Sequence, residues 1–172
     1  MKGNRIIAYS AALVALGIGL GYALAWLPNV ELVSFTAALA GFILGRTWGI
    51  IDGALIFGIY SALSPFGMAP LPLLLAQIIG GAFIGLLGAL MRERLKKAHF
   101  AAIAGIIGTA FYDIITNAAG FVAFPTKQAF LAYIVAGLSF SLVHIVSNAV
   151  IFAVLFPVIS KGDLTKKLIV RR

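Results

Sequence analysis

The stretch FLAYIVAGLSFSLVHIVSNAVIFAVLFPV, residues 130–158, contains no Asp, Glu, Lys or Arg. A helix needs roughly 20 mostly apolar residues to cross a hydrocarbon core about 30 Å thick, and this stretch is longer than that. The rest of the chain has the same character, since 62% of its 172 residues are hydrophobic, 10% are charged and the mean hydropathy is +1.10. The sequence therefore predicts an all-α integral membrane protein in which residues 1–172 form a single membrane domain.

Five further apolar segments precede this stretch. Hydropathy and helix stop signals together predict a bundle of six transmembrane helices, over residues 6–27, 32–45, 47–63, 71–91, 100–121 and 130–158. The segment 32–45 covers only about 21 Å at 1.5 Å per residue, so a re-entrant hairpin over residues 32–63 is the alternative. Both arrangements leave the two chain ends on the same side of the membrane.

The lysines and arginines indicate which side that is. Only Lys127 falls in a loop on the opposite side from the chain ends. The other twelve of the 13 are Lys2, Arg5, Arg46, Arg92, Arg94, Lys96, Lys97, Lys161, Lys166, Lys167, Arg171 and Arg172. By the positive-inside rule we expect both termini in the cytoplasm and a multi-pass protein of the inner (cytoplasmic) membrane. Contact with anionic lipid headgroups accounts for the net charge of +8, so a nucleic-acid partner is not expected.

Polar residues inside the last two predicted spans are candidates for a binding site. Such residues are costly in lipid and usually face the bundle interior or a water-filled cavity. Asp113 and Asn117 lie four residues apart on one helical face, and so do His144 and Asn148. We expect these four side chains to hydrogen-bond a polar small molecule. The alternative is that they bind one another and hold the two helices in register.

Three more candidates lie near the predicted outer surface. Gln77 and Tyr133 are expected to reach a cavity open to the outside, with an interhelical hydrogen bond and an interfacial anchor as their respective alternatives. Glu31 stands at the outer mouth, where it either holds substrate or caps the helix that follows. Asp52, by contrast, is expected to pair with Arg46 or with a partner protein rather than with substrate.

The first predicted span carries small residues at close spacing. Ala8 and Ala12, and likewise Ala11 and Ala15, are four residues apart, which lets another helix approach closely. Packing inside the bundle and docking of a second membrane protein both explain this pattern.

Familiar catalytic patterns are absent from the sequence. It has no cysteine, no Walker A loop, no G-x-S-x-G and no H-E-x-x-H motif, so we expect no catalytic residue, no metal site, no cofactor and no enzyme activity. A channel would need polar groups through the whole membrane thickness, whereas here they gather in the outer half and the middle. The pattern favours a substrate-binding protein. An independent small-solute carrier or channel and a non-transporting scaffold protein are the alternatives.

Five stretches of the sequence carry a resemblance to a known family. They are PNVELVSF (28–35), AGFILGRTWG (40–49), AQIIGG (76–81), YDIITN (112–117) and HIVSN (144–148). With them the chain resembles, over nearly its whole length, the substrate-binding S component of energy-coupling factor transporters.

This resemblance implies a function and a set of partners. The expected substrate is a vitamin or cofactor precursor, and the expected partners are a transmembrane T component and two cytoplasmic ATPase subunits. The resemblance implies docking of the T component at Ala11 and Ala15, with Ala8 and Ala12 as an alternative register. It also implies a binding site in the outer half of the bundle. Asp113, Asn117, Gln77 and Tyr133 match that position best, Glu31 is possible, and His144 and Asn148 lie deeper.

Overall fold

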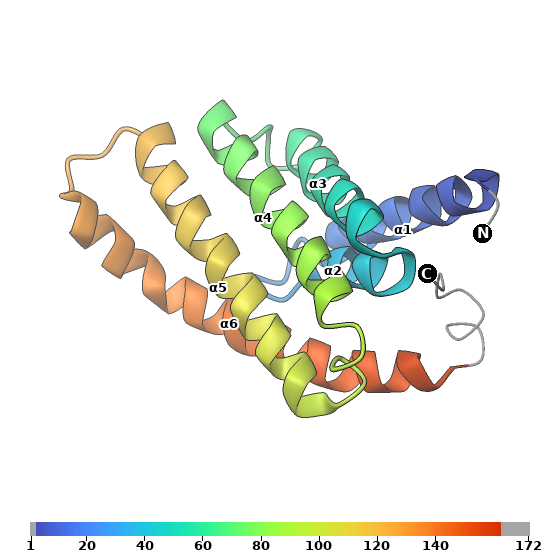
Figure 1. Ribbon diagram of the computed structural model, residues 1–172. Coiled ribbons are helices and arrows are strands. Elements are labelled where there is room, and N and C mark those ends of the chain that lie inside the picture. Colours follow the sequence, from blue (N-terminus) through green and yellow to red (C-terminus); the bar gives the residue numbers. More distant parts are fainter. Residues whose placement is uncertain (1–2, 163–172) are drawn as a thin grey trace.

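The chain folds as a bundle of helices. The computed structural model describes residues 3–162, and within that range the chain forms six α-helices and no strand (Figure 1). The helices are α1 (Gly3–Ala23), α2 (Val33–Leu44), α3 (Arg46–Ala62), α4 (Leu71–Leu90), α5 (Ala98–Ala123) and α6 (Phe130–Lys161). Each overlaps one predicted segment, so the all-α prediction is confirmed. Five of the basic residues, namely Lys2, Lys166, Lys167, Arg171 and Arg172, lie outside the described residues.

The lengths of the helices bear on how the chain meets a membrane. Among the described residues, α1 (from Asn4), α4, α5 and α6 are long and apolar enough to cross it. In contrast, α2 has only 12 residues and α3 has 17. The protein is therefore membrane-embedded, and a crossing by α2 and α3 stays a prediction.

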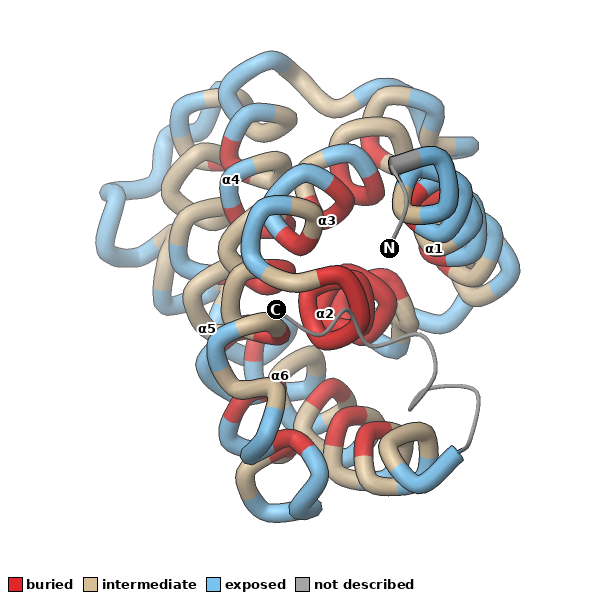
Figure 2. Tube along the Cα trace, turned by 45° about the vertical axis from the view of Figure 1, so that its right-hand side comes forward, coloured by how far each residue is buried: buried red, intermediate tan, exposed pale blue. Residues whose placement is uncertain are grey.

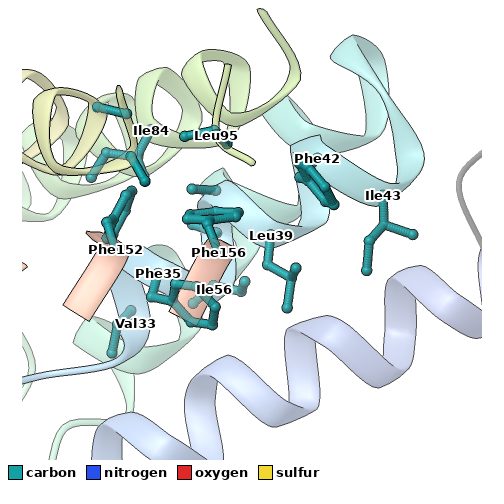
Figure 3. Close-up of a cluster of buried hydrophobic side chains, with 14 of the residues drawn as sticks. Val33, Phe35, Leu39, Phe42, Ile43, Ile56, Ile84, Leu95, Phe152 and Phe156 are labelled. Carbon is teal, nitrogen blue, oxygen red and sulfur yellow. The ribbon is translucent and has the colours of Figure 1, made fainter. Parts of the chain in front are cut away.

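The short helix α2 lies at the centre of the bundle. All of its residues are buried, which Figure 2 shows as a continuous red tube. It packs against α1, α3 and α4 and also touches α5 and α6. Aromatic rings fill the contact with α6, where the ring centroids of Phe35 and Phe156 are 4.9 Å apart and those of Phe42 and Phe156 are 5.5 Å apart (Figure 3). A helix surrounded by protein in this way needs no match to the thickness of the bilayer.

Glycines let α2, α3 and α4 approach backbone to backbone. A methyl group on Gly85 would collide with the backbone oxygen of Gly49, and one on Gly41 would collide with that of Gly85. Lipid is as apolar as a leucine side chain, so helices in a membrane associate through close packing rather than through the hydrophobic effect. These three helices therefore form the tightly packed part of the bundle.

Asp52 does not pair with Arg46, and that prediction is wrong. The Asp52 side chain is fully buried and accepts a 2.6 Å hydrogen bond from Ser10 Oγ, which joins α3 to α1. Residues six apart are rotated by about 240° around a helix, so Arg46 lies on another face of α3 and is exposed. Burial also keeps Asp52 out of reach of a partner protein.

The α5–α6 pair forms a hairpin on the side of the bundle opposite α1 (Figure 1). Among the described helices, α6 packs along α5 and otherwise touches only α2. The first third of α6, residues 130–140, is mostly exposed, because no helix other than α5 covers it. This leaves room for a cavity between the hairpin and the loop that joins α1 to α2.

Candidate ligand-binding site

A tight turn carries the chain from α1 toward this cavity. Helix α1 ends at Ala23, four residues before the predicted residue 27, and turns fill residues 24–29. In the last of them Val30 N donates to Leu27 O at 3.3 Å. Pro28 and Asn29 occupy the two central positions, and Asn29 has φ +60°. Proline followed by a residue with positive φ is the pattern of a type II turn, and this turn directs Glu31 into the bundle.

Glu31 uses both carboxylate oxygens. Oε2 accepts a 2.8 Å hydrogen bond from the backbone N–H of Ser34, in the first turn of α2. Oε1 accepts a 2.8 Å hydrogen bond from Asn148 Nδ2 and lies 3.3 Å from His144 Nε2. The residue thus makes the cap that was one of its two predicted roles, and it also reaches the polar face of α6.

His144 bridges two carboxylates. Its Nδ1 lies 2.8 Å from Asp113 Oδ1 on α5, while its Nε2 faces Glu31. We call Glu31, His144, Asp113 and Asn148 the acid–imidazole cluster. Within it Asp113 is 8% exposed and Asn148 is fully buried. The cluster ties the α1–α2 loop, α5 and α6 together, so residues that are far apart in the sequence form one polar unit.

The two contacts of His144 fix the charge of the cluster. Both ring nitrogens face carboxylate oxygens, and a neutral imidazole has a single N–H. A second proton must therefore sit either on the imidazole or on one of the carboxyl groups. The net charge is −1 in both cases.

The pKa of Glu31 is lowered in this environment. Burial by itself raises the pKa of the Glu31 carboxyl. Hydrogen bonds from His144, Ser34 and Asn148, together with the charge of the imidazole, outweigh burial and bring the pKa below its ordinary value. Glu31 is therefore held in its ionised form.

A cavity of about 430 Å³ lies beside the cluster. Ligand pockets commonly measure about 300–1,000 Å³, so a small organic molecule fits this volume. Asn117 Nδ2 donates to Ser141 Oγ at 3.3 Å within its wall. The lining residues are Asn29, Asp113, Thr116, Asn117, Gln128, Tyr133, Ala136, Gly137, Phe140 and Ser141. Asp113 belongs to both this lining and the acid–imidazole cluster, and so connects them.

The predicted site residues fall into two places. Asp113, Asn117 and Tyr133 line the cavity, whereas Glu31, His144 and Asn148 lie in the cluster that Asp113 joins to it. Gln77 is apart from them. It lines a second cavity of about 360 Å³ beneath the α3–α4 loop, together with residues such as Tyr60 and Phe124, and its buried Oε1 has no hydrogen-bond partner.

Sequence reasoning missed several polar residues of the wall. Ser141 precedes His144 by three residues on α6, so helical spacing alone was a signal that they share a face. Asn29 precedes Glu31 by two residues and carries the turn signal of an Asn after a Pro. Thr116 follows Asp113 by three residues on α5 and so had the same signal, whereas Gln128 lies in a loop and had none.

The small residues of α1 divide into an inner and an outer set. Gly17 packs against Ile56, and Gly21 packs against Val33 and Tyr60, so these glycines serve the bundle. The other set is exposed. It consists of Ala8, Ala11, Ala12 and Ala15.

Comparisons with protein-family models, with curated proteins and with solved structures gave no match to this chain. Its function is therefore argued from the site itself.

Proposed function

We propose that the chain is the membrane-embedded substrate-binding subunit of an ATP-driven importer of the energy-coupling factor type. It captures a vitamin or cofactor precursor from outside the cell and performs no catalysis. The observation that carries this proposal is the cavity of about 430 Å³, whose wall gathers polar side chains in a chain that is 62% hydrophobic. Polar groups are costly inside a membrane, and their gathering around one cavity of ligand size is typical of a binding site.

The proposal includes six crossings with both chain ends in the cytoplasm of a multi-pass inner-membrane protein. The charges support this orientation, because Lys127 is the only basic residue in the loops assigned to the outside. The shortness of α2 does not oppose it, since protein covers that helix on all sides. Arg92 Nη2 donates to the carbonyl oxygen of Ile43 at 3.3 Å, which helps to satisfy the last turn of α2 without water.

The proposed partners are a T component and two cytoplasmic ATPase subunits. The exposed alanines of α1 support a docking face, because small side chains let a second helix pack closely. Ala11 and Ala15 form the primary contact in this proposal, with Ala8 and Ala12 as the alternative register. ATP hydrolysis by the partners then supplies the energy for uptake.

The test is uptake by the reconstituted complex. The chain is co-expressed with T component and ATPase subunits, purified gently in detergent, and the small molecule that it retains is identified by mass spectrometry. We expect ATP-dependent uptake of that molecule into proteoliposomes. Replacing Ala11 and Ala15 by leucine should abolish co-purification and uptake, while Ala98→Leu, at an exposed position on α5, should leave both intact.

Two outcomes would contradict the proposal. Uptake by the purified chain alone, without ATP, indicates an independent carrier or channel. Retention of no small molecule, combined with stable capture of a different membrane protein, indicates a scaffold.

A further inference from the structure

Two buried acceptors of the acid–imidazole cluster have no donor. They are Oδ2 of Asp113 and Oδ1 of Asn148. The orientation of the Asn148 amide is fixed, because its Nδ2 must be the atom that donates to the Glu31 carboxylate. Buried polar atoms without a partner are rare in proteins, and each needs an explanation. Both unpaired atoms are oxygens that can only accept hydrogen bonds, so only a donor group can satisfy them.

The charge of the cluster points the same way. Its net charge is −1 wherever the shared proton sits, and neither Glu31 nor Asp113 forms an ion pair with a lysine or arginine in the described chain. An uncompensated charge inside a membrane protein is expensive. A positively charged ligand beside Asp113 would neutralise the negative charge of the cluster, whereas a carboxylate ligand would add a second negative charge.

Aromatic rings complete the cavity. Tyr133 and Phe140 line it together with Asp113. The face of an aromatic ring attracts a cation, with a strength that grows when water is excluded. The same cavity contains no lysine, arginine or histidine among its lining residues that could receive an anion.

We propose that this site selects a small organic cation with several N–H donors, of the amine or amidine type, and rejects carboxylates. The Oδ2 atom of Asp113, which is a lining residue of the cavity, is the acceptor for those donors. The inference rests on the proposed function, because it names the chemical class of the substrate that the subunit captures.

The test uses three ligands of nearly equal shape and different charge. Benzamidinium is a cation with N–H donors only, benzamide is neutral, and benzoate is an anion with acceptors only. Their binding to the purified protein in detergent is measured by isothermal titration calorimetry. A charge-assisted hydrogen bond is stronger than one between neutral groups, so we expect benzamidinium to bind at least about tenfold more tightly than benzamide. Benzoate should bind most weakly of the three.

Variants assign this preference to the cluster. Asp113→Asn and, independently, Glu31→Gln should reduce the preference for benzamidinium over benzamide about tenfold, so that the two ligands bind about equally tightly. The matched control is Glu93→Gln, which also removes one negative charge but at an exposed residue paired with Lys96. It should keep the preference. Size-exclusion profiles confirm that each variant is folded, and Glu31→Gln decides the matter where Asp113→Asn does not fold.

Three results would overturn the inference. They are no measurable binding of benzamidinium, binding of benzoate as tight as that of benzamidinium, and a preference for the cation that survives both cluster variants. The importer proposal is judged separately. If the benzamidinium series fails but the retained molecule is taken up with ATP, only the substrate class is wrong. If benzamidinium binds as expected but uptake fails, the site stands without the importer.

Discussion

Replacing Glu31 by alanine should destabilise the protein strongly, because three donors lose their acceptor at once. These donors are the backbone N–H of Ser34 at 2.8 Å, Nδ2 of Asn148 at 2.8 Å and Nε2 of His144 at 3.3 Å. Leaving a buried donor unpaired costs about 1–3 kcal/mol, and removing one member of a buried ion pair costs about 3–5 kcal/mol. These costs overlap, and water from the neighbouring cavity relieves part of them, so we expect about 3 kcal/mol.

The assay is the midpoint of thermal unfolding in detergent. For a chain of this length about 1 kcal/mol corresponds to a shift of about 2–4 °C, so Glu31→Ala should lower the midpoint by about 6–12 °C. The control is Glu93→Ala, whose carboxylate is 77% exposed and pairs only with Lys96. An exposed pair contributes about 0–1 kcal/mol, so this midpoint should fall by no more than about 4 °C. Equal shifts for the two variants would refute the view that the acid–imidazole cluster holds the loop, α5 and α6 together.

Three further changes test the surrounding structure by the same thermal assay. Gly85→Ala should lower the midpoint by at least the equivalent of about 1–3 kcal/mol, because the added methyl group meets the backbone of Gly49. The control is Gly19→Ala, whose methyl group has nothing within 4 Å and should leave the midpoint unchanged or raise it. An unchanged midpoint in Gly85→Ala would contradict the close packing of α3 against α4. Because the pKa of Glu31 is lowered on folding, its contribution to stability is complete above pH 4.5 and is lost as the pH falls through the lower folded-state pKa. The difference in midpoint between wild type and Glu31→Gln should therefore narrow below pH 4.5, and a difference that widens there would show that the sign of the shift is wrong. Asn29→Ala should lower the stability of the folded protein by about 1 kcal/mol, because alanine adopts a positive φ less readily, while Asn29→Gly should leave the stability unchanged. Equal losses of stability in the two variants would mean that the turn does not need a positive φ at residue 29.

The number and order of the helices followed from the sequence because lipid imposes a simple rule. Apolar runs of sufficient length become helices, and prolines, glycines and charges separate them. The rule failed at the end of α1, where residues 24–27 are apolar but turn instead of continuing the helix. The turn with Pro28 and Asn29 outweighed hydropathy there. A proline that ends a helix acts on the residues before it, and hydropathy alone does not report how many.

Which residues meet across the bundle was harder to predict. Helical spacing correctly placed Asp113 with Asn117 and His144 with Asn148 on shared faces, because that geometry is local. The contact of Glu31 with His144 depends on how a loop enters the bundle, and 113 residues separate the two. No local pattern encodes such a contact.

The small residues of α1 show the same limit. Spacing by four fits both an internal and an external helix contact, so the sequence did not distinguish Gly17 from Ala15. In the structure, the position of each residue around α1 decides this. Gly17 meets Ile56, whereas Ala15 is exposed.

Asp113 allows its structural and binding roles to be separated, because they fall on different atoms. Oδ1 lies against His144, whereas Oδ2 has no partner. In Asp113→Asn the amide oxygen can still accept from His144, so we expect the unfolding midpoint to fall by no more than the equivalent of about 1–2 kcal/mol. The amide NH2 group, a donor, then takes the place of the acceptor Oδ2. The preference among ligands should therefore move from benzamidinium toward benzamide and benzoate. A large fall in the midpoint with an unchanged ligand preference would instead show that Asp113 serves only to hold α5 to α6.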